Sequence, residues 1–107
     1  MEINQFGIYW VNLNPTLGSE IAKTRPCVVA SPDVLNKHLN TVVVIPLTST
    51  IKPYSFRIPC IINGKSGAIA TDQIRTVDKA RIKAQLGSLP VEEINKLKMA
   101  LYMMFCE

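Results

Sequence analysis

An arginine stands at the start of a predicted strand, immediately before a proline, in the pair Arg25-Pro26. Proline restricts the residue before it to extended backbone, so Arg25 is held in a narrow range of conformations. A guanidinium fixed in this way can present parallel N–H groups to a phosphate, which makes Arg25 a candidate phosphate-binding residue. The alternative is an ordinary charged residue at a strand end, where charged side chains commonly lie.

Two further polar segments follow predicted strands. Thr48-Ser49-Thr50 comes after the apolar run 41–46, and its hydroxyl groups suit either a phosphate or the polar groups of their own turn. Asp72-Gln73-Ile74-Arg75 places a carboxylate and an amide, both planar, beside a cation. That combination suits base edges and a phosphate, and a local salt bridge is the alternative.

Residue types exclude several kinds of active site. His38 is the only histidine, so no pair of histidines exists within one chain, and we expect His38 to be exposed on a short helix. No nucleophile elbow, P-loop, zinc-protease or dinucleotide-binding motif is present. Cys27, Cys60 and Cys106 lack CxxC spacing and form no Cys/His cluster, so we predict no metal site and no cofactor.

Short apolar runs separated by Pro, Gly and Asn dominate all but the C-terminal part of the chain. They predict strands over 7–13, 25–31, 41–46, 54–62, 66–71, 74–77 and 84–87, with 41–46 central and apolar on both faces. Loops are expected over 14–23 and 47–53, and a tight turn at Asn63-Gly64. Ser31 is the expected cap of a short helix with Pro32 at its first position. Together these elements predict a small, strongly bent antiparallel barrel.

A helix begins at Pro90, with acidic residues in its first turn where the helix dipole favours them. Its expected core stripe consists of Ile94, Leu97, Leu101, Met104 and Phe105. Met99, Tyr102 and Met103 make the opposite side apolar too. A helix with two apolar faces needs two surfaces to pack on, so either the helix is fully enclosed or a second subunit or partner covers it.

The charge is unevenly distributed along the chain, whose formal net charge is +4. No acidic residue occurs from Val34 through Thr71, whereas Lys37, Lys52, Arg57 and Lys65 fall in that span. A one-sided basic segment suits a polyanion such as RNA, and a solvated surface is the alternative. We expect a cytoplasmic protein with no membrane association, because no signal peptide or membrane-length apolar run is present and unpaired thiols fit a reducing compartment.

Read in order, the motifs resemble those of one known family. The segment 7–20, with its loop Pro15-Thr-Leu-Gly-Ser-Glu20, resembles the opening of MazF/PemK toxins. Similar matches follow along the chain at compatible spacing: Thr24-Arg25-Pro26, Ser31-Pro32, Pro46-Leu47-Thr48-Ser49, Gly67-Ala68-Ile69 and 72–78. The resemblance covers almost the whole chain, up to the terminal helix.

The resemblance implies one toxin domain over residues 1–107. Its fold would be mainly β with α: an SH3-like antiparallel barrel of the MazF/CcdB type, with a short helix after the second strand and a C-terminal helix. It implies a homodimer that binds single-stranded RNA in a groove across the interface. The ribose 2′-hydroxyl would attack the adjacent phosphate without a metal, leaving a 2′,3′-cyclic phosphate and a 5′-hydroxyl. A cognate antitoxin would cover the groove with a disordered tail that folds on binding.

Carried over by position, Arg25 and Thr48 take the catalytic places. Arg25 would stabilise the phosphorane, because a guanidinium with a pKa above ~12 is a poor general base. Glu20 is a third catalytic candidate, and either Glu20 or Asp72 would accept the proton of the 2′-hydroxyl. Some relatives have an arginine, as the acid that protonates the leaving oxygen, where this chain has Ala70. This chain cannot use that version of the acid, so we expect Arg25 to protonate the leaving oxygen as well. The other expected substrate-binding residues are Ser19, Lys23, Thr24, Ser49, Gln73 and Arg75.

Two alternatives use the same barrel without cutting RNA. One is a toxin that poisons DNA gyrase through its terminal helix, although the apolar Met103-Met104-Phe105 is no clear match to such an end. The other is a catalytically inactive RNA- or protein-binding barrel. The sequence does not identify the RNA motif, because base readout of a single strand depends on loop shape.

Overall fold

β3, Thr41–Thr48, is the strand around which the sheet is built. Its first half pairs with β6 (Arg75–Asp78), its middle with β2 (Thr24–Val29) and its last two residues with β5 (Lys65–Ala70). A run of β-branched residues that is apolar on both faces favours such a position, with neighbours on each side. The prediction of a central strand at 41–46 is therefore confirmed.

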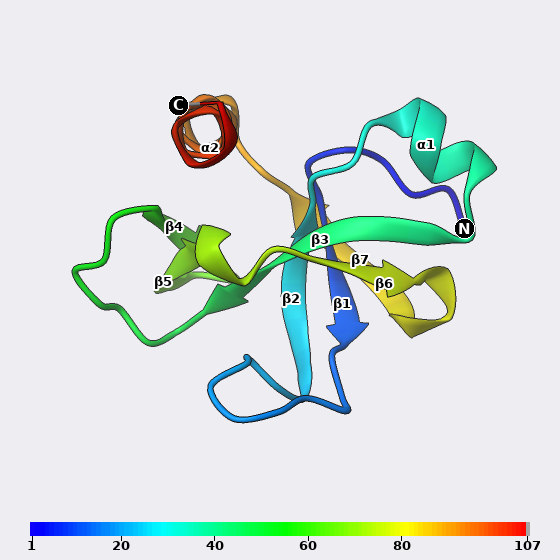
Figure 1. The fold of residues 1–107 in the computed structure, drawn as a ribbon, viewed down its shortest axis with the longest axis horizontal. Coiled ribbons are helices and arrows are strands. Elements are labelled where there is room, and N and C mark those ends of the chain that lie inside the picture. Colours follow the sequence, from blue (N-terminus) through cyan, green and yellow to red (C-terminus); the bar gives the residue numbers. More distant parts are fainter. Residues whose placement is uncertain (107) are drawn as a thin grey trace.

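The structure, a computed structural model, describes residues 1–106. The sheet has the order β4-β5-β3-β2-β1-β7, with β6 added on β3, and every pair is antiparallel. The remaining elements are β1 Gly7–Asn12, α1 Asp33–His38, β4 Arg57–Ile62, the 3₁₀ turns η1 Thr71–Gln73 and η2 Lys79–Arg81, β7 Ile82–Ser88 and α2 Val91–Phe105. Figure 1 shows the sheet curling on itself, with α2 near β4 at the left of the view and α1 near the start of β3 at the right. The predicted small antiparallel barrel with two helices is confirmed.

Two apolar clusters form the core, one on each face of the strands. Along β1, Ile8 enters the cluster beneath α2, whereas Tyr9 and Val11 enter the cluster enclosed by the rest of the barrel. β3 alternates in the same way, with Ile45 in the first cluster and Val44 in the second. This follows from the two-residue period of a strand, which sends successive side chains to opposite faces.

Several predicted boundaries differ from the structure. β3 continues to Thr48 because Leu47 and Thr48 pair with Ile69 and Ala68, so the following loop begins at Ser49. β4 begins at Arg57, after the predicted start at residue 54, and β7 begins at Ile82, before the predicted start at residue 84. Asn63 and Gly64 both have positive φ and join β4 to β5, as a two-residue hairpin turn requires.

Ser31 does not cap α1, so that prediction was wrong. The N-cap is Pro32, and no side chain caps the helix. The Ser31 hydroxyl instead donates to Asn36 Oδ1 (2.5 Å) and accepts from the backbone N–H of Val43 (3.0 Å). The hydroxyl therefore joins α1 to β3 and is no longer available to the helix terminus.

α2 buries one face against β4 and η1, with Leu97 and Ala100 in the core. The placement of Phe105 in the core stripe was wrong, because this side chain is 63% exposed. Met99, Tyr102 and Met103 are also more than half exposed. In the single chain, the second apolar side of α2 is therefore uncovered. No helix within residues 1–106 is long and apolar enough to span a membrane.

Candidate functional site

The register of β2 on β3 carries Arg25 and Thr48 to one end of the strand pair. Cys27 pairs with Pro46, and two residues further toward the start of β2 and the end of β3 stand Arg25 and Thr48. Both side chains line a cleft of about 380 Å³, which we call the Arg25–Thr48 cleft. Its other lining residues are Ser19, Glu20, Ile21, Ala22, Thr50, Lys52, Tyr54 and Arg57. The structure thus brings together the two side chains that the sequence singled out.

Arg25 is half-buried and held at one edge of its guanidinium. Its Nε donates to the carbonyl oxygen of Ala22 (3.2 Å). Of the five N–H groups of an arginine, the four on the two terminal nitrogens remain for a ligand. The extended backbone before Pro26 and this contact fix the fork, so binding a phosphate costs less side-chain entropy.

Thr48 is buried, with 7% of its surface exposed. Its Oγ1 accepts a hydrogen bond from the backbone N–H of Thr50 (3.1 Å). The sequence left open whether this hydroxyl serves its own turn or a phosphate, and the geometry permits both. The oxygen supports the turn, while the hydroxyl hydrogen is available to donate.

Two smaller clefts, each of about 250 Å³, adjoin the first through shared residues. Arg25 also lines the cleft that contains Ser49, and Glu20 also lines the cleft that contains Asp72, Gln73 and Arg75. Figure 1 shows the β1–β2 loop and the β3–β4 loop on either side of this end of the strands. Eight of the ten predicted site residues therefore line these three adjoining clefts, while Lys23 and Thr24 line none of them.

The β1–β2 loop is fastened to the sheet by two of the predicted RNA contacts. Gln73 Oε1 accepts from the backbone N–H of Ile21 (3.4 Å), and Arg75 Nη1 donates to the carbonyl oxygen of Leu13 (3.1 Å). Glu20 stays within the loop, where its Oε1 accepts from the backbone N–H of Leu17 (2.7 Å). Gln73 and Arg75 thus position the loop that carries Glu20.

Arg57 is a site residue that sequence reasoning missed. Its Nε and Nη2 donate to the two carboxylate oxygens of Asp72 (2.5 and 2.9 Å), and its guanidinium carbon lies 5.3 Å from the centre of the Tyr54 ring. The salt bridge of Asp72, in η1, is therefore made with the first residue of β4 and not with the nearby Arg75. The hydrogen bond from Arg57 lowers the pKa of Asp72 below its ordinary value. Arg57 falls in the segment without acidic residues, from Val34 through Thr71. Only the pairing of β4 with β5 shows that Arg57 lies within reach of Asp72.

The buried thiols are poor nucleophiles. Burial raises the pKa of Cys27 to about 12 and that of Cys60 to about 11, so neither carries appreciable thiolate at neutral pH. Both belong to the core clusters. Within residues 1–106, no three His, Cys, Asp or Glu side chains are grouped so as to hold a metal ion.

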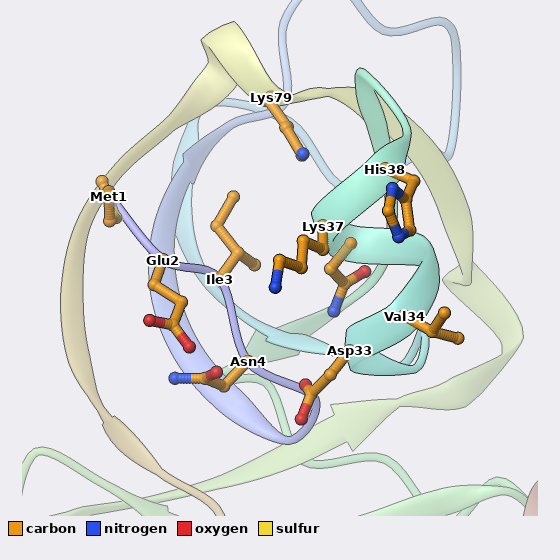
Figure 2. Close-up of a pocket in the computed structure, with 10 residues that line it drawn as sticks. Met1, Glu2, Ile3, Asn4, Asp33, Val34, Lys37, His38 and Lys79 are labelled. Atoms are coloured by element: carbon orange, nitrogen blue, oxygen red, sulfur yellow. The ribbon is translucent and has the colours of Figure 1, made fainter.

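A larger cavity, of about 620 Å³, lies elsewhere, between the N-terminal residues and α1. Figure 2 shows Lys37 and Lys79 reaching toward it, with Glu2 and Asp33 at its rim and His38 on the outer side of α1. Asp33 already accepts from the backbone N–H of Gln5 (2.7 Å). Glu2 and Asp33 offset Lys37 and Lys79 there, whereas the Arg25–Thr48 cleft has Arg25, Lys52 and Arg57 against the single carboxylate of Glu20. The excess of positive charge makes the Arg25–Thr48 cleft the better candidate site for a polyanion.

Comparison with known proteins matches residues 4–105 to the family model described as PemK-like, MazF-like toxin of type II toxin–antitoxin system. The chain is 32% identical over 92 residues to the endoribonuclease toxin MazF of Escherichia coli K12, covering 85% of this chain and 83% of that protein. MazF from Deinococcus radiodurans matches with a TM-score of 0.89 at 26% identity, covering 100% and 99% of the two chains. A MazE–MazF structure from the same organism matches with a TM-score of 0.80 at 25% identity, covering 97% and 96%.

Proposed function

We propose, from the premise that this chain belongs to the PemK-like, MazF-like toxins of type II toxin–antitoxin systems, that it cuts single-stranded RNA at the Arg25–Thr48 cleft. The chain is a MazF-like endoribonuclease toxin of a toxin–antitoxin pair. The observation that carries the site assignment is the position of a fixed guanidinium and a buried hydroxyl on one cleft. One domain spanning residues 1–107 performs the reaction, in the cytoplasm where its RNA substrate is translated.

The proposed reaction needs no metal. The 2′-oxygen of a ribose attacks the adjacent phosphorus, its proton passes to a carboxylate, and the bond from phosphorus to the 5′-oxygen breaks. The products are a 2′,3′-cyclic phosphate and a 5′-oxygen that takes up a proton to become a hydroxyl. Arg25 stabilises the negative charge of the phosphorane with its free N–H groups, and Thr48 donates to a non-bridging oxygen.

Glu20 and Asp72 are the candidate proton acceptors, since each lines a cleft that contains or adjoins Arg25. Ser19 and Ser49 each line a cleft together with Arg25, and their hydroxyl groups suit contacts to the RNA backbone. Gln73 and Arg75 reach the RNA beside the loop that they fasten, and Lys23 and Thr24 add contacts at the loop end.

A homodimer and a cognate antitoxin complete the proposal. The exposed apolar side of α2, with Met99, Tyr102, Met103 and Phe105 all more than half exposed, supports burial against a second copy. The antitoxin binds with a disordered tail that folds over the RNA groove, which prevents RNA from entering. Light scattering of the purified protein tests the dimer, and a monomeric mass at micromolar concentration would contradict it.

A cleavage assay tests the reaction. Purified protein is incubated with a long single-stranded transcript in the presence of EDTA, and the new ends are identified. We expect cuts at a short motif, with cyclic phosphate and 5′-hydroxyl ends. Fragments that carry 5′-phosphate ends, or cleavage that EDTA abolishes, would contradict the mechanism. Intact RNA combined with inhibition of DNA supercoiling would instead support a gyrase-poisoning toxin.

A further inference from the structure

The Arg25–Thr48 cleft contains a second arginine that the mechanism above does not use. Arg57 is the first residue of β4 and pairs with Ala70 of β5. Paired residues in an antiparallel sheet project to the same face, so the long side chain of Arg57 extends past the small side chain of Ala70. Asp72 follows two residues after Ala70, and this is where the guanidinium of Arg57 is held.

The guanidinium is fixed along one edge and free along the other. Asp72 accepts from Nε and Nη2 of Arg57, which occupies two of its five N–H groups. Within residues 1–106, the remaining three N–H groups have no hydrogen-bond partner, although the side chain is only 10% exposed. Tyr54 lies against the same group, with its ring centre 5.3 Å from Cζ. A half-paired guanidinium that is held on two sides and lines a cleft is preorganised to bind an anion.

We propose that Arg57 binds a backbone phosphate of the RNA in the Arg25–Thr48 cleft, and that Asp72 is the positioning residue that orients it. This inference rests on the proposed function, because it takes single-stranded RNA as the ligand of the cleft. It supplies a second fixed guanidinium beside Arg25, and Lys52, which also lines the cleft, adds to the positive charge there.

The inference also narrows the choice of proton acceptor. Both carboxylate oxygens of Asp72 accept hydrogen bonds from Arg57, and the hydrogen-bonded guanidinium lowers the pKa of this carboxyl. A general base works best with a pKa near the working pH, so a carboxylate stabilised in this way accepts protons poorly. Glu20 uses only Oε1 in its hydrogen bond with the backbone N–H of Leu17, and it lines the same cleft as Arg25. Asp72 therefore orients Arg57 while Glu20 is left as the candidate base.

The test compares Arg57→Met, Arg57→Lys, Asp72→Asn and Lys83→Met with the wild type. Lys83 is the matched control, an exposed cation on β7 that lines none of the clefts described above. The probe is an oligonucleotide spanning the site that the wild-type protein cuts most often in a transcript, with a 2′-O-methyl group at the attacking ribose to prevent cleavage. Its affinity is measured from low to high salt, and kcat/KM is measured on the unmodified oligonucleotide.

Removing one phosphate contact lowers the slope of log K against log salt by about 0.7 for single strands. We expect that decrease for Arg57→Met together with a roughly 10- to 100-fold loss of kcat/KM, while Arg57→Lys keeps the slope and Lys83→Met matches the wild type. Asp72→Asn should lower kcat/KM less than Arg57→Met and leave the acidic limb of the pH–rate profile in place. Thermal unfolding identifies any variant that fails to fold. If Arg57→Met is one of these, Arg57→Lys is compared with the wild type instead. Lysine keeps the charge but lacks the two-pronged guanidinium, so we expect a lower kcat/KM for Arg57→Lys.

Three results would overturn the inference. The first is a wild-type salt slope and rate in folded Arg57→Met. The second is loss of the acidic limb in Asp72→Asn with a rate decrease of roughly 10²-fold or more, which would make Asp72 the base. The third is wild-type protein that leaves all RNA intact, which would refute the proposed function itself. The first two results would leave the endoribonuclease assignment unchanged.

Discussion

Gly67 lies against the backbone of Thr48. A Cβ atom built on Gly67 would be 2.8 Å from the carbonyl oxygen of Thr48 and 2.5 Å from Cδ1 of Ile62. Real Cβ atoms essentially never approach a backbone oxygen this closely, so the end of β3 can occupy its position only if residue 67 has no side chain. The position of the catalytic candidate Thr48 therefore depends on a glycine in the neighbouring strand.

Gly67→Ala should impair both stability and cleavage. Inserting a methyl group against fixed backbone costs about 1–3 kcal/mol of folding free energy, and a misplacement of about 1 Å near the reacting atoms can cost ~10²-fold in rate. Urea unfolding and kcat measure the two effects. Gly87→Ala is the matched control, because a Cβ there meets no atom within 4 Å. Equal stability and kcat in the two variants would show that β5 does not constrain Thr48.

Arg25→Ala should abolish cleavage while the protein stays folded, and Thr48→Ala should have the smaller effect. Thr48 contributes one neutral donor, whereas Arg25 contributes a charged fork of four available N–H groups. A single donor at a transition state is worth about 10²–10³ in rate, and we expect Arg25→Ala to exceed that range. Single-turnover cleavage of a transcript measures both. Wild-type cleavage by folded Arg25→Ala would disprove the site assignment.

Local sequence patterns predicted the strands and turns well where a single local preference, such as β-branching or positive φ, determines the structure. The β-branched run at the centre of the chain required a buried strand, and Asn63-Gly64 required a hairpin turn. The boundaries failed where tertiary pairing overrode local signals. Thr48 belongs to β3 because β5 pairs with it, and Ser31 serves Asn36 and Val43 instead of the helix terminus. β5 is distant in sequence from Thr48, as Val43 is from Ser31, so no local pattern could indicate these two contacts.

The candidate site was predictable only in part, for the same reason. Arg25 and Thr48 could be chosen because each stands at a strand end and matches a family motif. Arg57 could not be chosen, because its role depends on the register that places it opposite Ala70 and within reach of Asp72. Asp72 was interpreted as a possible base because its partner, at the start of another strand, was not visible in the sequence.

The Asp72–Arg57 pair should stabilise the fold except in acid. The pKa of Asp72 is lower in the folded protein than its ordinary value of 3.8, so the unfolded chain binds this proton more tightly. The stabilising contribution is therefore present above about pH 4 and is lost as the pH falls through the lower, folded-state pKa. Because the Asp72 side chain is 40% exposed, the effect is modest and weakens at high salt.

Comparing Asp72→Asn with the wild type isolates that contribution from those of the other carboxyl groups. Urea midpoints measured at pH 7 and pH 3 should fall further for the wild type than for Asp72→Asn. The same experiment in the Arg57→Met background should remove the difference, because the carboxylate then has no guanidinium partner. An equal fall in wild type and Asp72→Asn would mean that the pair does not stabilise the folded state in solution.

Thr71 carries a hydroxyl whose burial is uncompensated. The residue is fully buried, and Oγ1 is the buried side-chain polar atom within residues 1–106 that lacks a hydrogen-bond partner. An unsatisfied buried hydroxyl costs about 1–3 kcal/mol, and valine has nearly the same shape without that cost. Thr71→Val should therefore raise stability by about 1 kcal/mol, which corresponds to roughly 4–8 °C in Tm.

Thr76→Val, at an exposed position of β6, is the control and should change stability by less than about 0.5 kcal/mol. A lower Tm for Thr71→Val would mean that the hydroxyl has a partner, such as a buried water molecule, whose hydrogen bond outweighs the cost of burial.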